Sequence, residues 1–186
     1  MSTSHESISY EIDILVSPDT RASELAVMGQ LDASEVWEDR LCQWLMLLAE
    51  DLPPAIAYEV SLQFTNDQEV RELNAAYRQQ DRSTDVLSFA AIDADLPRSP
   101  DLPLCLGDII ISVEMAERQA IDRKHTLTEE LLWLAAHGLL HLLGWDHPDE
   151  ASLSVMLAQQ DRLLQAVGYS VPYDDVASAS PNRIQP

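Results

Sequence analysis

Two stretches of the chain alternate apolar and polar residues with a period of two. One covers residues 8–14, and the other covers residues 58–64. Because successive side chains of a strand point to opposite faces of a sheet, this alternation predicts two half-buried β-strands. Two short apolar runs, at residues 86–89 and 106–112, predict two further strands. The second of these runs is apolar enough to be buried on both faces.

Segments with helical periodicity lie between the strands. The first is expected to begin at Ser34, whose hydroxyl can cap a helix, and to end before Pro53. The second opens with residues 65–68, which have the form of a capping box. The apolar positions expected to face the core are Trp37, Leu41, Trp44 and Leu48 in the first helix and Val70, Leu73 and Tyr77 in the second. This order predicts a sheet with helices packed on it.

The C-terminal half of the chain predicts three more helices, two of which follow residues 106–112. The second of these two has Thr126 and Glu129 as a capping box and is apolar nearly all round, so we expect it to be central and buried. A last helix is expected to begin at Pro148 and to end before Gly168. The proline-rich residues 93–103 predict a surface loop.

Length and composition indicate one domain with a tail. Residues 1–169 suffice for a single apolar core, whereas residues 170–186 contain few large apolar side chains and predict a mobile tail.

The net charge of −21 argues against a surface that binds nucleic acid non-specifically. Two cysteines form no disulfide framework, and no leader or membrane-spanning run is apparent. We therefore expect a reduced cytoplasmic protein that is neither exported nor membrane-bound.

Three of the five histidines lie near the end of the predicted buried helix. His137, His141 and His147 have the spacing H-x-x-x-H-x-x-G-x-x-H. Residues four apart share a helix face, so the first two can reach one ion, and Gly144 can turn the chain back to bring in the third. Three protein ligands with one open position are typical of catalytic zinc sites. The alternative is three unconnected histidines, two of which would gain nothing from facing inward on an apolar helix.

The residue after the first histidine separates this motif from that of the metzincin proteases. Those enzymes carry Glu there as the general base, whereas this chain has Gly138. A glycine inside a helix costs about 1 kcal/mol relative to alanine, so it needs a reason. It either clears space beside the metal for a bulky substrate or allows tight helix packing. In both cases the protease base is missing.

Three blocks of the sequence together resemble the YbeY family of endoribonucleases. The blocks are residues 73–89, 106–112 and 137–147, and the last matches the pattern HG-x-LH-x-x-G-x-DH at every position. The resemblance covers about residues 8–168. Three departures are visible: Trp145 stands where the family usually has Tyr, Gln80 where Lys is common, and Ala90 where Pro is frequent. The missing Lys weakens the expectation of a basic RNA groove.

The resemblance implies both a fold and a function. The fold is α+β, with a small mixed four-stranded sheet, about five helices and a metal site at the end of the central helix. One Zn²⁺ per chain is implied on the three histidines, with no organic cofactor. The implied function is that of a cytoplasmic, zinc-dependent endoribonuclease specific for single strands, in 16S rRNA 3′-end maturation and ribosome quality control. Its implied partners are rRNA and the small ribosomal subunit or its assembly factors.

Arg78 and Asp146 are the candidate catalytic residues beside the metal. The Arg78 guanidinium can hold a phosphate bidentately and stabilise transition-state charge, although a surface ion pair with Asp81 or Asp85 is an alternative. Asp146 can orient a metal-bound histidine or cap the last helix. The weaker candidates, with solvent-facing or structural roles expected, are Asp85, Asp108 and His125. A metalloprotease and a non-catalytic, metal-stabilised ribosome assembly factor stay open as alternative functions.

Overall fold

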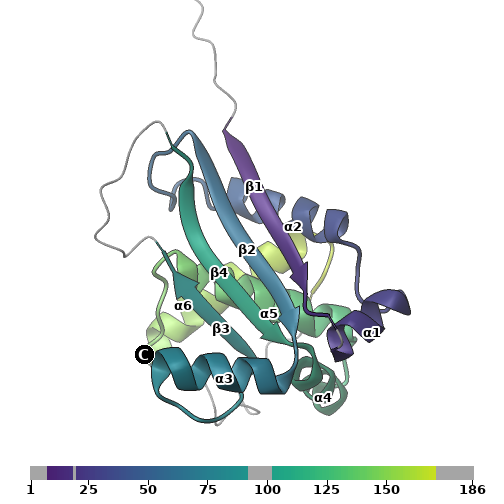
Figure 1. Cartoon of the computed structure of the whole chain (residues 1–186). Helices are drawn as coiled ribbons and strands as arrows, with labels where there is room; N and C mark the ends of the chain where they lie inside the picture. Colours follow the sequence, from purple (N-terminus) through teal and green to yellow (C-terminus); the bar gives the residue numbers. More distant parts are fainter. Residues whose placement is uncertain (1–7, 19, 92–101, 171–186) are drawn as a thin grey trace, which may run out of the picture.

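The chain forms one mixed sheet and six helices within residues 8–18, 20–91 and 102–170, which the computed structural model describes (Figure 1). The strands are Ser9–Val16 (β1), Ala57–Thr65 (β2), Val86–Ala90 (β3) and Leu104–Ser112 (β4). The helices are Arg21–Val27 (α1), Ser34–Leu47 (α2), Asp67–Arg78 (α3), Val113–Arg123 (α4), Leu127–Leu142 (α5) and Glu150–Ala166 (α6). All four predicted strands are confirmed.

The strands are ordered β1-β2-β4-β3 in the sheet. β2 lies parallel to both β1 and β4, and the edge strand β3 runs antiparallel to β4. Parallel strands need a crossover connection, and helices supply it here. α1 and α2 lie between β1 and β2 along the chain, and α3 lies between β2 and β4. The mixed four-stranded sheet implied by the family resemblance is therefore confirmed.

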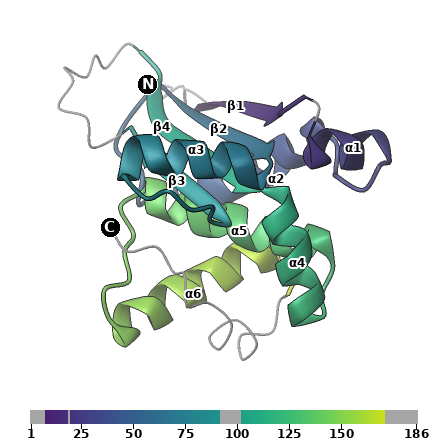
Figure 2. The same ribbon diagram turned by 60° about the horizontal axis from the view of Figure 1, so that its bottom comes forward.

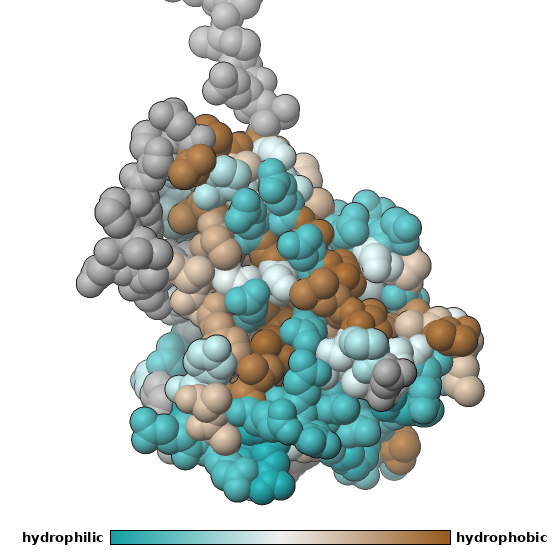
Figure 3. Space-filling view, viewed as in Figure 1, coloured by the Kyte–Doolittle hydropathy of each residue, from teal (hydrophilic) through white to brown (hydrophobic). Residues whose placement is uncertain are grey.

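Helices pack on both faces of the sheet at β4. Ile109 and Ile111 point into the main core beneath α5, whereas Ile110 packs with Val70 of α3 on the opposite face. Figure 2 shows α3 and α5 on opposite sides of the sheet, with α6 beyond α5. Apolar side chains gather over the sheet, and the surface over α3 and α4 is largely hydrophilic (Figure 3). The prediction that residues 106–112 are buried on both faces is confirmed for residues 109–112, whereas Asp108 is exposed.

Helix α5 is the buried centre of the molecule. It lies between the sheet and α6, and twelve of its sixteen residues are buried. The predicted capping box starts it: the Thr126 hydroxyl accepts from the Glu129 amide, and the Glu129 carboxylate accepts from the Thr126 amide. The prediction of a central apolar helix is therefore confirmed, and this helix carries two of the three clustered histidines.

A buried ionic network joins α4 to α5. The Glu130 side chain is fully buried, and its carboxylate lies 2.5 Å from the guanidinium of Arg123, whose side chain is 3% exposed. The other carboxylate oxygen contacts Nε2 of His125. Arg123 in turn lies 5.5 Å from the ring centre of Trp133. His125, a weak candidate for the active site, therefore has a structural contact instead.

Two helix starts differ from the prediction. Ser34 is the first residue of α2, the cap position is Ala33, and no side chain caps it. At α3 the cap is Asn66, whose side chain accepts from the Glu69 amide, so the predicted capping box at residues 65–68 is wrong. β2 extends through Thr65, which moves the helix start one residue onward.

The last helix also starts later than predicted. Asp149 caps α6, which begins at Glu150, so Pro148 stands before the helix and Asp146 is not its cap.

Two further features differ from the prediction. The short helix α1 was not predicted. Tyr77 was expected to face the core, but its side chain is 71% exposed, because α3 covers only β3 and β4 with a narrow apolar stripe.

The predicted surface loop and the predicted mobile tail fall mostly outside the described residues. These are the proline-rich loop at 93–103, of which only 102 and 103 are described, and the tail at 170–186, of which only Ser170 is described. Among the described residues, no helix combines the length and apolarity needed to cross a membrane.

Candidate metal centre

The end of α5 brings the three histidines together. His137 and His141 project from its last two turns. The chain then reverses at Gly144, whose φ of +82° is readily adopted by glycine. The amides of Gly144 and Trp145 donate to the carbonyls of His141 and Leu140, a Schellman arrangement that closes the helix. This turn carries His147 back toward the helix end, as the spacing predicted.

The imidazole nitrogens of the three residues converge on one point. One ring nitrogen from each of His137, His141 and His147 lies within 4.8 Å of the other two. The Nε2 atoms of His137 and His141 are 3.1 Å apart. The predicted cluster is therefore confirmed, and its nitrogen donors are of the kind that bind zinc and other borderline metal ions.

The state of these nitrogens fits a metal ion. Nε2 of His147 is buried without a hydrogen-bond partner among the described residues, which is costly unless a ligand satisfies it. Burial, followed by the neighbouring His147, lowers the pKa of His141 to about 4. His141 is thus neutral near pH 7, which is the form that coordinates metal. These residues can hold one metal ion.

Arg78 ends α3 on the other side of β3. Its Nη2 donates to the backbone carbonyl of Ser88 at 3.1 Å, and its guanidinium carbon lies 5.9 Å from the ring centre of Phe89. Ser88 also donates from its hydroxyl to the carbonyl of Gly138, next to the first histidine. Burial lowers the pKa of Arg78, and the Arg78 charge is one of the influences that lower the pKa of His141.

The alternative of a surface ion pair for Arg78 is wrong. Asp81 pairs with Arg71 instead, with oxygen–nitrogen distances of 2.6 and 2.9 Å. Asp85 accepts from the Gln119 amide at 3.0 Å and from the Val86 backbone. The guanidinium of Arg78 is instead held against β3 by Ser88 and Phe89.

Gly138 serves the packing of α5 against the sheet. A Cβ atom at this position would lie 2.7 Å from Cγ2 of Ile109 and 3.0 Å from the Ser88 hydroxyl. The distance to Ile109 is shorter than real Cβ contacts, so a larger residue here would require the Ile109 side chain or α5 to shift. Of the two explanations considered for this glycine, tight packing is confirmed.

Neither of the other two candidate acids, Asp146 and Asp108, is recorded in a hydrogen bond with an imidazole ring among the described residues. Asp146 is exposed, and its carboxylate accepts from the backbone amide of His147 at 2.8 Å. Asp108 is exposed on the open face of β4. A residue that the sequence did not single out, Gln160 of α6, contacts His137: its Oε1 lies 3.3 Å from Nδ1 of the ring.

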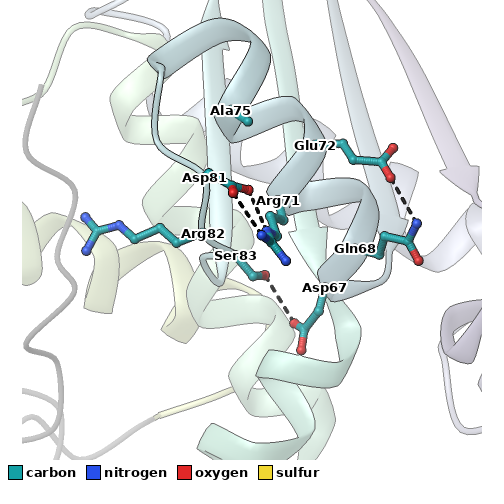
Figure 4. Close-up of a pocket in the computed structure, with 8 residues that line it drawn as sticks. All are labelled: Asp67, Gln68, Arg71, Glu72, Ala75, Asp81, Arg82 and Ser83. Atoms are coloured by element: carbon teal, nitrogen blue, oxygen red, sulfur yellow. Dashed lines mark hydrogen bonds and ion pairs between the residues drawn. The ribbon is translucent and has the colours of Figure 1, made fainter.

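A separate pocket of about 790 Å³ lies between α3 and the segment that follows it (Figure 4). Its lining residues are Asp67, Gln68, Arg71, Glu72, Ala75, Asp81, Arg82 and Ser83. Polar groups here bond to one another: Arg71 with Asp81, Gln68 with Glu72, and Ser83 with Asp67. No histidine of the cluster lines this pocket, so we assign the chemistry to the metal centre.

The fold and the histidine cluster define a small α+β protein with a site suited to one metal ion. A family model described as Endoribonuclease YbeY matches residues 13–168. The Endoribonuclease YbeY of Trichormus variabilis is 55% identical over 149 residues, which span 77% of this chain and 85% of that protein. The one from Synechocystis sp. is 46% identical over 166 residues, 87% of this chain and 93% of that protein. The chain belongs to the YbeY family.

A solved structure supports the fold. The solution structure of TM1509 from Thermotoga maritima matches with a TM-score of 0.53 at 25% sequence identity, over 84% of this chain and 88% of that one. The α+β architecture is therefore shared with an experimentally determined protein.

Proposed function

We propose that this protein is a zinc-dependent endoribonuclease that cleaves single-stranded RNA. The observation that carries the proposal is the convergence of three imidazoles at the end of α5, with the guanidinium of Arg78 held nearby by β3, in a member of a family described as endoribonucleases. Cytoplasmic maturation of the 16S rRNA 3′ end and ribosome quality control are the proposed roles. The small ribosomal subunit or its assembly factors are the proposed partners.

The three histidines hold the metal in this proposal. Neutral imidazoles leave a divalent ion its full charge, and bound zinc would supply Lewis acidity and make water a stronger nucleophile near neutral pH. His137 is fixed by α5 packing, whereas His147 depends on the turn at Gly144. Asp146 accepts the His147 backbone amide, and we propose that it orients this ligand.

Arg78 would act on the phosphodiester group. Its planar fork matches two phosphate oxygens, and its burial strengthens any interaction with developing negative charge. The bond to the Ser88 carbonyl occupies Nη2, which leaves the remaining guanidinium donors to bind a phosphate. Because the chain carries a net charge of −21, free RNA should bind weakly and with strong salt dependence.

The test compares three substrates at low salt: a single-stranded RNA, the same RNA annealed into a duplex, and an unstructured peptide. We expect zinc-loaded protein to cleave only the single strand, with the products resolved by gel electrophoresis. The control is the double variant His137→Ala/His141→Ala, which should bind no zinc and leave all three substrates intact. Metal-dependent peptide cleavage would point to a protease. Intact RNA alongside retained binding to small ribosomal subunits would point to an assembly factor.

A further inference from the structure

Gln160 is a buried polar residue in the middle of α6. Its side chain is 1% exposed, although the helix around it packs apolar residues against the core. A buried amide is stable only if its donor and acceptor atoms are satisfied. Both partners of Gln160 belong to α5: the Trp133 carbonyl and the ring of His137. The amide therefore connects the last helix to the metal centre.

The polarity of these two bonds is fixed by chemistry. The Trp133 carbonyl can only accept, so the Gln160 atom facing it at 2.9 Å must be the NH₂ group. The amide oxygen then faces Nδ1 of His137 at 3.3 Å. Because an amide oxygen cannot donate, Nδ1 must carry the proton. This tautomer places the lone pair of His137 on Nε2, which points at Nε2 of His141 at 3.1 Å.

We propose that Gln160 is a positioning residue for the metal centre, which selects the Nδ1-protonated tautomer of His137 and so directs Nε2 to the metal. The Trp133 ring helps to fix the plane of this imidazole, because it stacks on His137 with an interplanar angle of 8° and a centroid distance of 5.3 Å. Metal-bound histidines commonly donate their other ring N–H to such an acceptor. The inference rests on the metal site of the proposed function, but it requires no RNA cleavage.

The first test is the zinc affinity of purified variants, measured by competition with a chromophoric chelator. We expect Gln160→Leu to bind zinc about 10- to 100-fold more weakly than the natural protein, as is typical when the acceptor beside a ligand is removed. Gln160→Glu restores an acceptor oxygen and should bind zinc more tightly than Gln160→Leu. The matched control is Gln165→Leu on the same helix, whose amide is exposed and bonds Asp161. It should bind zinc like the natural protein.

The second test needs no metal and begins with the natural protein. Long-range ¹H–¹⁵N NMR spectra of the metal-free natural protein report which nitrogen of His137 carries the proton. We expect the Nδ1-protonated form, and we expect Gln160→Leu to shift His137 toward the Nε2-protonated form. An Nε2-protonated His137 in the natural protein, or equal zinc affinities for Gln160→Leu and Gln165→Leu, would overturn the proposal. Absence of RNA cleavage with these results intact would instead reject the proposed activity alone.

Discussion

Replacing Arg78 by Ala is expected to slow RNA cleavage by about 100- to 1,000-fold, which is the usual cost of removing one preorganised group that stabilises transition-state charge. The zinc content should stay unchanged, because Arg78 contacts Ser88 and Phe89 and not the ligating nitrogens. If Arg78 acts mainly on the transition state, the single-turnover rate should fall more than the affinity for RNA. Arg78→Lys should recover only part of the rate, because an ammonium group cannot reproduce the bidentate fork.

A matched control for Arg78 lies on the same helix. Arg71 stands two turns earlier in α3, is exposed, and pairs with Asp81. Arg71→Ala removes the same charge and should leave the cleavage rate of bound RNA unchanged. Equal losses of rate and affinity in Arg78→Ala would show that Arg78 binds the phosphate equally well in the ground state and the transition state. Equal losses of rate in Arg78→Ala and Arg71→Ala would show that Arg78 contributes only its positive charge.

The second large effect is expected in stability. Glu130→Leu should lower the free energy of unfolding by about 3–5 kcal/mol, since it removes the carboxylate that pairs with the buried guanidinium of Arg123. Glu130 is fully buried, its carboxylate contacts both Arg123 and His125, and Arg123 is itself 3% exposed on its side chain. The measurement is urea denaturation followed by circular dichroism.

The neighbouring Glu129 provides the comparison. It belongs to the exposed capping box of α5, so Glu129→Leu should cost only about 1 kcal/mol. The double variant Glu130→Leu/Arg123→Leu should be more stable than Glu130→Leu alone, because it no longer buries the guanidinium. Equal losses for Glu129→Leu and Glu130→Leu would show that the network contributes no more than a surface cap.

The histidine cluster could be predicted because its geometry is local. Spacings of four residues, then a glycine, then a third histidine fix the site within one helix end and one turn. The tight packing of Gly138 was one of two explanations, and only the positions of Ile109 and Ser88 decide between them. Those residues are distant in sequence, so their approach depends on how α5 docks on the sheet.

Features that depend on tertiary contacts were missed or misplaced. Gln160 lies 23 residues after His137, and nothing in its neighbourhood along the chain marks it as a partner of a metal ligand. The signal available in the sequence was a glutamine at a position that continues the apolar stripe of the last helix. Tyr77 fits the helical period of α3, yet it is 71% exposed, because its ring meets only the edge of the sheet, at Phe89 of β3. Two helices, α3 and α6, begin one or two residues later than predicted, because the preceding strand or turn extends further along the chain.

The central claim is that the three histidines hold the metal that makes this protein a nuclease. The most direct measurement strips the metal with a chelator, returns zinc in steps, and follows bound zinc and single-stranded RNA cleavage in the same samples. The account predicts no cleavage without metal, a rate that rises with bound zinc, and a plateau at about one zinc per chain, as three ligands and an open position require. Full cleavage by the stripped protein, or zinc binding and cleavage retained in His137→Ala/His141→Ala, would contradict it.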